Sequence, residues 1–147
     1  QKQWKKYEWN NKIRKAVWRG ASTGHTVKFP DGSANFTSLP RTQLVLHGIQ
    51  RPDIMDTDFH KLVGRFKGQE KSLSHITKLG EKIKFQDFMK YKAIIDIDGY
   101  GWSSRFGSLL CTNSVIIKVQ PGYVDYYFNT TQPWIHYVPV YSNLTNL

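Results

Sequence analysis

The chain has 147 residues, of which 39% are hydrophobic and 14% aromatic, and its formal net charge is +10. A chain of this length can bury roughly 70% of the surface that its unfolded form exposes, and its aromatic content excludes a disordered tail. A single cysteine, Cys111, excludes an internal disulfide and a cysteine-based zinc site, and the sequence contains no apolar run long enough to span a bilayer. We therefore expect one packed domain over residues 1–147, with a surface that favours anionic partners.

The first half of the chain predicts one strand, one long loop and one helix. An apolar run at residues 16–18 is expected to form a strand that ends in a turn at Arg19-Gly20. Residues 21–38 predict a loop, because Gly24, Pro30, Asp31, Gly32 and Ser33 break regular structure there. Ser38 is a candidate cap for a helix through about residue 47, which Gly48 would end. Residues 51–79 show no sustained period, and we expect loops there with at most a short helix or strand.

The second half of the chain has the pattern of a strand-helix-strand unit. A short helix is expected over residues 85–90, followed by a buried strand over residues 93–97, which are β-branched and nearly continuous in their hydrophobicity. A turn over residues 98–102 leads to a helix over residues 105–111, with Ser103 at the N-cap position, and residues 115–119 predict a second strand.

Two further elements are expected near the C-terminus. Residues 123–128 predict a short aromatic helix after the Pro-Gly break, and residues 135–140 alternate as a strand does. Parallel strands that are joined by short helices indicate an open α/β sheet.

The turn after the strand over residues 93–97 has the chemistry of an anion site. Gly99 and Gly101 can adopt a positive φ and let a ligand approach the backbone, and the amides of Ser103, Ser104 and Arg105 would point out of a helix N-terminus. The spacing Gly-x-Gly-x-x-Ser matches neither the dinucleotide fingerprint nor the phosphate loop of nucleotide hydrolases. A tight connection without a ligand is therefore the alternative interpretation.

Several polar and aromatic residues admit a structural interpretation. Asp96 and Asp98 share one face of a strand and resemble a metal-binding carboxylate pair, but the same face can be buried and hydrogen-bonded, and we predict no metal site. His136 is expected to be a hydrogen-bonded structural residue and Trp134 a core residue. Trp102 suits either stacking on a ligand or packing.

Three separated motifs follow one another along the chain. They are Trp18-Arg19-Gly20-Ala21-Ser22-Thr23-Gly24 with the later Arg41, then Asp96-Ile97-Asp98-Gly99 with Trp102-Ser103-Ser104-Arg105-Phe106, and Pro133-Trp134-Ile135-His136-Tyr137-Val138-Pro139-Val140. In this order they resemble the CAP10 family, the family 90 glycosyltransferases, which include protein O-glucosyltransferases and capsule-associated xylosyltransferases. The resemblance covers residues 9–140.

The resemblance implies a two-lobed GT-B enzyme that transfers a sugar from a UDP-sugar without a metal or another cofactor. The chain looks like the Rossmann-like, donor-binding lobe, incomplete at both ends. The resemblance also implies a nucleotide-sugar site. Its residues would be Arg19, Arg41, Gly99, Ser103, Ser104, Arg105 and Phe106.

The chain departs from the family pattern in two places. Ala21 stands where relatives carry a serine near the donor, and whether Ser22 substitutes for it is open. The family's catalytic base belongs to an N-terminal lobe that would precede Gln1, so no catalytic residue is assigned.

The expected function is glucosyl or xylosyl transfer from a UDP-sugar to a hydroxyl of a protein or glycan acceptor. The alternative is an inactive, truncated module that binds a nucleotide sugar or a partner. Nucleic-acid binding through the basic stretches 1–20 and 61–84 would make affinity fall steeply with salt, and we predict no nucleic-acid partner. Three glycosylation sequons suit a glycoprotein of the endoplasmic reticulum or Golgi lumen, and they begin at Asn35, Asn129 and Asn143.

Overall fold

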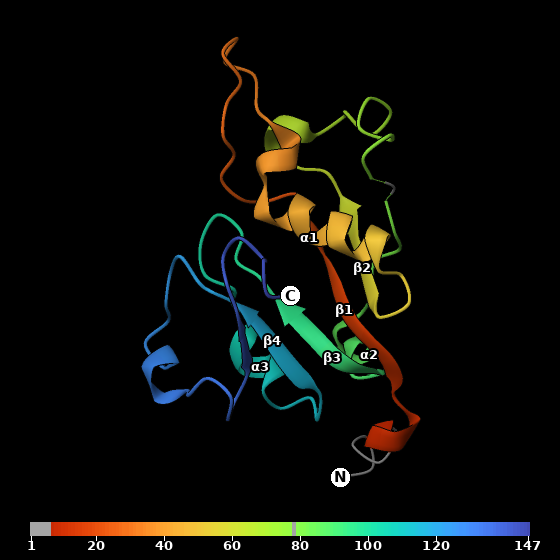
Figure 1. Cartoon of the computed structure of the whole chain (residues 1–147), viewed down its shortest axis with the longest axis vertical. Coiled ribbons are helices and arrows are strands. Elements are labelled where there is room, and N and C mark those ends of the chain that lie inside the picture. Colours follow the sequence, from red (N-terminus) through yellow and green to blue (C-terminus); the bar gives the residue numbers. More distant parts are fainter. Residues whose placement is uncertain (1–6, 78) are drawn as a thin grey trace.

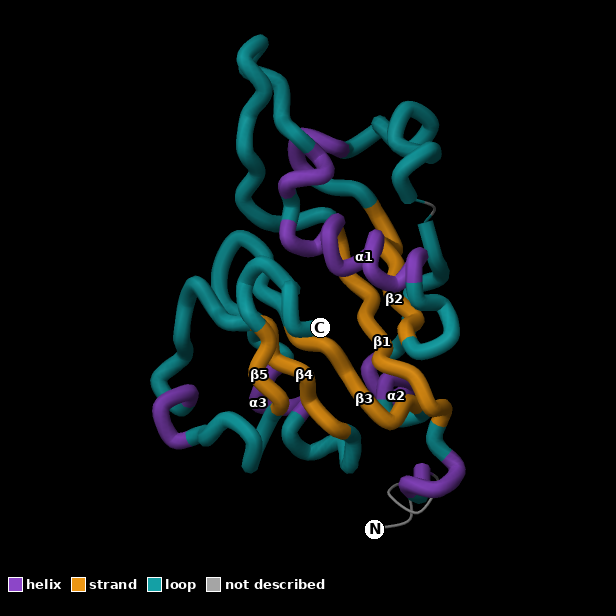
Figure 2. The backbone as a smooth tube through the Cα atoms, viewed as in Figure 1, coloured by secondary structure: helices purple, strands orange, loops and turns teal. Residues whose placement is uncertain are grey.

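A five-stranded parallel sheet forms the centre of the protein, in the order β2-β1-β3-β4-β5 (Figures 1 and 2). All of its strand pairs are parallel, which confirms the predicted open α/β sheet. The structure, a computed structural model, describes residues 7–77 and 79–147. The strands are β1 (Ile13–Ala21), β2 (Met55–Lys61), β3 (Tyr91–Asp96), β4 (Val115–Val119) and β5 (Val138–Val140).

Helices cover both faces of this sheet. The helix α1 packs its buried residues into the core on one face, and α2 and α3 pack into the core on the other (Figure 1). No helix within residues 7–77 and 79–147 is long and apolar enough to cross a membrane. The α-helices are α1 (Pro40–Gln50), α2 (Phe85–Phe88) and α3 (Phe106–Leu109), and the short 3-10 helices are η2 (Trp9–Asn11), η3 (Phe36–Ser38), η4 (Gly64–Phe66) and η5 (Phe128–Thr130).

The two cores follow from the alternation of side chains along the central strands. In β1, Val17 joins the core under α2 and α3, whereas Trp18 joins the core under α1. In β3, Ile94 joins the core under α2 and α3, and Ile95 joins the core under α1. Because successive side chains of a strand point to opposite faces, a continuous apolar run is what a strand with both faces covered requires.

The helix α1 continues beyond the point at which the sequence predicts its end. Gly48 lies inside it, and a Cβ atom at this position would be 1.9 Å from Oγ1 of Thr57 on β2. The glycine therefore allows close contact between helix and strand rather than ending the helix. The predicted cap is also wrong, because Leu39 is the N-cap residue and the Ser38 hydroxyl donates to the carbonyl of Asn35.

The C-terminal region has less regular structure than its sequence predicts. In place of a helix over residues 123–128 there is only η5, and the last strand is shortened to β5. Residues 134–136 form a turn in which Trp134 adopts a φ of 67° and is 74% exposed. The prediction of Trp134 as a core residue is therefore wrong.

Candidate functional site

The strand order places a cavity where ligands of open α/β sheets bind. From β1 the chain leads to β2 on one side and then returns to β3 on the other, so the loops after β1 and β3 diverge at the carboxyl edge. A cavity of about 380 Å³ opens there. Its lining comes from the end of β1, the start of α1, the end of β2 and the loop after β3, namely residues 19–21, Thr23, Arg41, His60 and residues 99–105.

Arg41 joins the two loops at this cavity. Its guanidinium donates to the carbonyls of Asp98 (2.9 Å), Ile97 (3.0 Å) and Ala21 (3.0 Å). A fourth hydrogen bond runs to Oγ1 of Thr23 at 2.6 Å. Burial, with a contribution from Arg105, lowers the pKa of Arg41 to about 10, so the side chain stays charged at neutral pH. Arg41 therefore fixes the cavity wall and adds positive potential, with most of its donors already committed.

Gly99 is needed at the cavity because of close packing and not because of its φ. The glycines with positive φ among the described residues are Gly24, Gly32, Gly64 and Gly68, so the expectation of positive φ at Gly99 and Gly101 is wrong. A Cβ atom on Gly99 would be 2.5 Å from Oγ1 of Thr23 and 3.1 Å from a terminal nitrogen of Arg41. A Cβ atom on Gly101 would have no heavy atom within 4 Å.

This difference gives a matched pair of variants. Gly99→Ala should displace Thr23 or Arg41 and cost about 1–3 kcal/mol of unfolding free energy, as overpacking does elsewhere. Gly101→Ala should change it by less than about 0.5 kcal/mol. Chemical denaturation of both variants measures the difference. Equal stability of the two would contradict the packing role of Gly99.

A buried ion-pair network supports the loop after β3. Lys118 on β4 donates to Oδ2 of Asp96 at 2.7 Å and to Oδ1 of Asp98 at 3.0 Å. The hydroxyl of Ser103 donates to Oδ1 of Asp96, and its amide donates to Asp98 at 3.2 Å. Asp96 is fully buried and Lys118 is 3% exposed, so the network is shielded from solvent.

The same network changes two expectations about the loop. Ser103 does not cap α3, because its hydroxyl bonds to Asp96 and the N-cap residue is Arg105. The helix α3 has only four residues, so its dipole contributes little to anion binding.

The two carboxylates that resemble a metal-binding pair, Asp96 and Asp98, are both paired with Lys118. Among the described residues there is also no cluster of three or more histidine, cysteine or acidic side chains that could hold a metal.

Arg105 is the cation of this cavity with the most uncommitted donors. Within the described part of the chain its guanidinium makes one hydrogen bond, to the carbonyl of Arg19 at 3.1 Å, and lies 5.9 Å from the ring centre of Phe88. A guanidinium has five N–H donors, so most of them are free to grip an anion. Burial lowers the pKa of Arg105, yet an arginine stays protonated at neutral pH. Ser104, an exposed neighbour, lines the same cavity.

Arg19 reaches the cavity, but its charge is committed to two carboxylates. Its guanidinium is 2.6 Å from Oδ1 of Asp56 and 3.3 Å from Oδ2 of Asp58, both on β2. Tyr91 donates to the other oxygen of Asp56 at 2.5 Å. Burial raises the pKa of Asp56, but hydrogen bonds from Tyr91 and Arg19 outweigh it and hold that pKa below its usual value. Burial raises the pKa of Asp58.

Two residues from the sequence motifs lie away from the cavity. Phe106 is 3% exposed and packs with Tyr127 and Phe128 in the core on the face of the sheet that α2 and α3 cover. Ser22 is fully buried, and its hydroxyl accepts from the amide of Val63 at 2.8 Å. Ser22 therefore does not take the place of a serine at position 21. The predicted site residues that meet at the cavity are Arg19, Arg41, Gly99, Ser103, Ser104 and Arg105.

Sequence reasoning missed three contributors to this region. Lys118 had a visible signal, since a lysine within a run of β-branched residues needs a buried partner. His60 lines the cavity at the end of β2, a strand that was not predicted at its position. Thr23 lines the cavity and holds Arg41; it belongs to the first motif of the resemblance, but no role was predicted for it.

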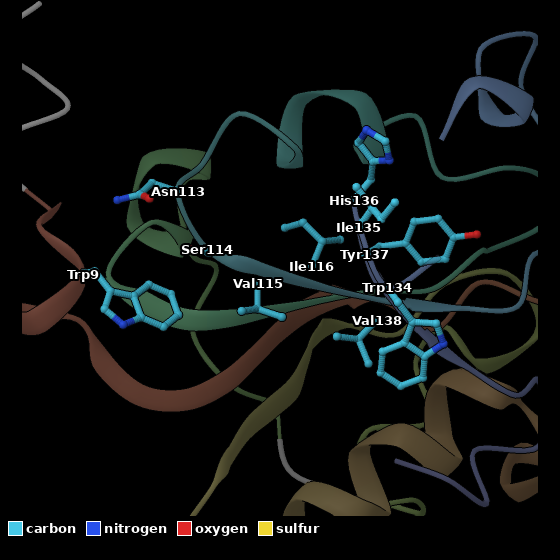
Figure 3. Close-up of a pocket in the computed structure, with 10 residues that line it drawn as sticks. All are labelled: Trp9, Asn113, Ser114, Val115, Ile116, Trp134, Ile135, His136, Tyr137 and Val138. Carbon is cyan, nitrogen blue, oxygen red and sulfur yellow. The ribbon is translucent and has the colours of Figure 1, made fainter. Parts of the chain in front are cut away.

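A second hollow, of about 400 Å³, is lined by residues around the starts of β4 and β5 (Figure 3). Trp9 flanks it on one side and Trp134 on the other, with Val115 and Ile116 between them. His136 lies on its rim, where Nδ1 accepts from the amide of Gln132 at 2.9 Å, as expected for a structural histidine. This hollow lacks the arginine side chains of the first cavity.

The sequence of the chain is similar to those of several O-glucosyltransferases. Protein O-glucosyltransferase 3 of Rattus norvegicus is 30% identical over 141 residues, which make up 95% of this chain and 24% of that relative. Protein O-glucosyltransferase 2 of Danio rerio is 30% identical over 139 residues, or 24% of its length. The O-glucosyltransferase rumi homolog of Aedes aegypti is 26% identical over 134 residues, or 29% of its length. The chain thus spans about a quarter of these relatives. The profile of the family "Glycosyl transferase family 90" matches residues 1–147, and the chain belongs to that family.

Proposed function

We propose that the chain forms the donor-binding part of a glycosyltransferase that uses a UDP-sugar. The observation that carries this proposal is the guanidinium of Arg105, which faces a cation-rich cavity at the switch point of a parallel sheet with most of its donors free. Planar guanidinium groups bind diphosphates through paired hydrogen bonds. Arg41 adds a second permanent charge, and the exposed Ser104 adds a hydroxyl and an amide.

The same groups would assist the chemical step. When the bond between the sugar and the diphosphate breaks, negative charge accumulates on the departing phosphate oxygens. Arg105 would stabilise that charge by direct contact, and Arg41 by its fixed position in the cavity wall. Preorganised charge of this kind lowers the barrier without reorganisation during the reaction. The proposal requires no metal ion, because arginines supply the positive charge next to the phosphates.

The names of the relatives suggest the sugar and the acceptor. They are protein O-glucosyltransferases, so we propose glucose as the transferred sugar and a protein hydroxyl as the acceptor. A second lobe of the GT-B type would supply the acceptor site and the catalytic base. A lumenal location in the secretory pathway fits the sequons at Asn129 and Asn143, where both asparagines are exposed.

Thermal unfolding with and without UDP tests the donor site. UDP at about 100 times its dissociation constant should add roughly 2.7 kcal/mol to the unfolding free energy and raise Tm. UMP, which lacks the second phosphate, should stabilise less, and a short DNA duplex should not compete with UDP. A folded chain whose Tm is unchanged by saturating UDP would refute the proposal.

A second candidate function is a binding module without transferase activity. It is favoured by the contacts of two of the three cavity arginines, because Arg19 and Arg41 already bond to carboxylates and carbonyls of the protein itself. Such a module would bind UDP-glucose but would neither hydrolyse it nor transfer glucose to an acceptor peptide. Sugar release and transfer, measured on the same preparation that binds UDP, separate the two functions.

A further inference from the structure

His60 is a titratable side chain of the cavity that the donor site described above does not use. It is the sixth residue of β2 and shares one face of that strand with Asp56 and Asp58. It lines the cavity together with Arg19 and Arg105. Its Nδ1 is buried and has no hydrogen-bond partner within residues 7–77 and 79–147, although the residue as a whole is only half-buried. An unsatisfied buried nitrogen of this kind has an energetic cost in the free protein, and it is available to a proton or to a ligand group.

The charges around His60 oppose its protonation. Burial lowers its pKa below the usual value, and so do Lys61 from β2, Lys82 from the segment before α2, and Arg105 from the loop before α3. An interaction with the Gly20 backbone on β1 opposes this lowering. The charged groups on neighbouring positions of β1 and β2, Arg19 and Asp58, largely neutralise one another as an ion pair. Without a bound anion the imidazole is therefore neutral at neutral pH.

We propose, on the basis of the donor site above, that His60 takes up one proton from solvent when the diphosphate of a nucleotide sugar binds, and then adds a third cation to the site. The diphosphate brings negative charge beside Arg105 and so cancels the repulsion between that guanidinium and an imidazolium. The Gly20 backbone already favours the protonated ring. The imidazolium then donates a charge-assisted hydrogen bond toward the anion.

The sign of the pH dependence follows from this linkage. The pKa of His60 is lowered in the free protein and rises when the anion binds, so the complex holds more protons than the free protein. Affinity for the nucleotide sugar therefore strengthens as pH falls between the two pKa values, by at most about tenfold per pH unit. The dissociation constant should be smaller at pH 6 than at pH 8.

Calorimetric titration of the full chain with UDP-glucose, in two buffers that differ in ionisation enthalpy, measures the protons taken up. UDP-glucose is the suitable probe because both of its phosphates are esterified, whereas the terminal phosphate of UDP itself titrates near pH 6. At a pH between the two pKa values of His60, the parent protein should take up close to one proton for each UDP-glucose that binds. His60→Gln should bind within about threefold of the parent at pH 8 and take up none. The control His75→Gln removes an exposed histidine that does not line the cavity, and it should keep the uptake.

A second measurement on the parent protein guards against misfolding of the variant. The imidazole resonances of His60, followed by NMR between pH 5.5 and 8, should show a higher pKa in saturating UDP-glucose than without it. Binding with no proton uptake and an unchanged His60 pKa would overturn this inference and leave the donor site standing. Uptake that persists in folded His60→Gln would do the same. Failure of UDP-glucose to bind the parent would overturn the donor site and this inference together.

Discussion

Arg105→Met should weaken UDP binding by about 10–150-fold, because the expected net loss is that of one hydrogen bond from a charged group, about 1.5–3 kcal/mol. Methionine keeps an unbranched side chain that can still pack on Phe88, so the charge is removed with little change in packing. Fluorescence or calorimetric titration with UDP measures the loss. UMP should lose less affinity than UDP if Arg105 contacts the second phosphate.

A matched control for this variant is Arg51→Met, at the end of α1. Arg51 is exposed, pairs only weakly with exposed Asp53 at 3.1 Å, and does not line the cavity. This variant lowers the net charge by the same amount and should leave UDP affinity unchanged. If both variants weaken binding equally, general surface charge attracts the nucleotide and Arg105 has no specific role. If folded Arg105→Met binds UDP as the parent does, the assignment of Arg105 fails.

The central part of the fold was predictable because its determinants are local. The apolar run over residues 93–97, the glycine-containing turn and the run over residues 115–119 give β3, the loop and β4 at nearly the predicted bounds. The strand β2 was not predicted at its position, because one of its faces carries the half-buried polar residues Asp56, Asp58 and His60, and only Met55, Thr57 and Phe59 alternate as buried residues. His60 lines the cavity, and Asp56 and Asp58 form ion pairs with Arg19, so these contacts require polar residues that hide the strand pattern in the sequence.

The roles of the arginines were less predictable, because each depends on partners far away in sequence. Arg19 pairs with Asp56 and Asp58 through the register of β1 and β2, in which Arg19 lies opposite Asp58. Arg41 holds carbonyls at positions 97 and 98, which only the packing of α1 brings near. The partners of the three arginines were not visible in the sequence, and their contacts in the structure leave Arg105 as the one most available to a ligand.

The ion pair between Lys118 and Asp96 leads to the prediction with the largest expected effect on stability. Lys118→Met should lower the unfolding free energy by about 3–5 kcal/mol, because it leaves a fully buried carboxylate without its cation. The double variant with Asp96→Asn should lose less than the sum of the two single variants, by about 0.5–3 kcal/mol of coupling. Chemical denaturation of the parent, both single variants and the double variant measures this coupling.

A surface ion pair provides the comparison for that cycle, and UDP binding provides its functional readout. Lys90 and Asp87 are 2.7 Å apart but substantially exposed, so Lys90→Met should cost less than about 1 kcal/mol of unfolding free energy.

The buried network around Lys118 also holds Ser103, which precedes Ser104 and Arg105 in the cavity wall. Lys118→Met should therefore weaken UDP binding at temperatures where the variant remains folded, although Lys118 itself is buried. A variant that loses stability but keeps full UDP affinity would show that the loop holds its geometry without the ion pair, and that the network serves the fold alone.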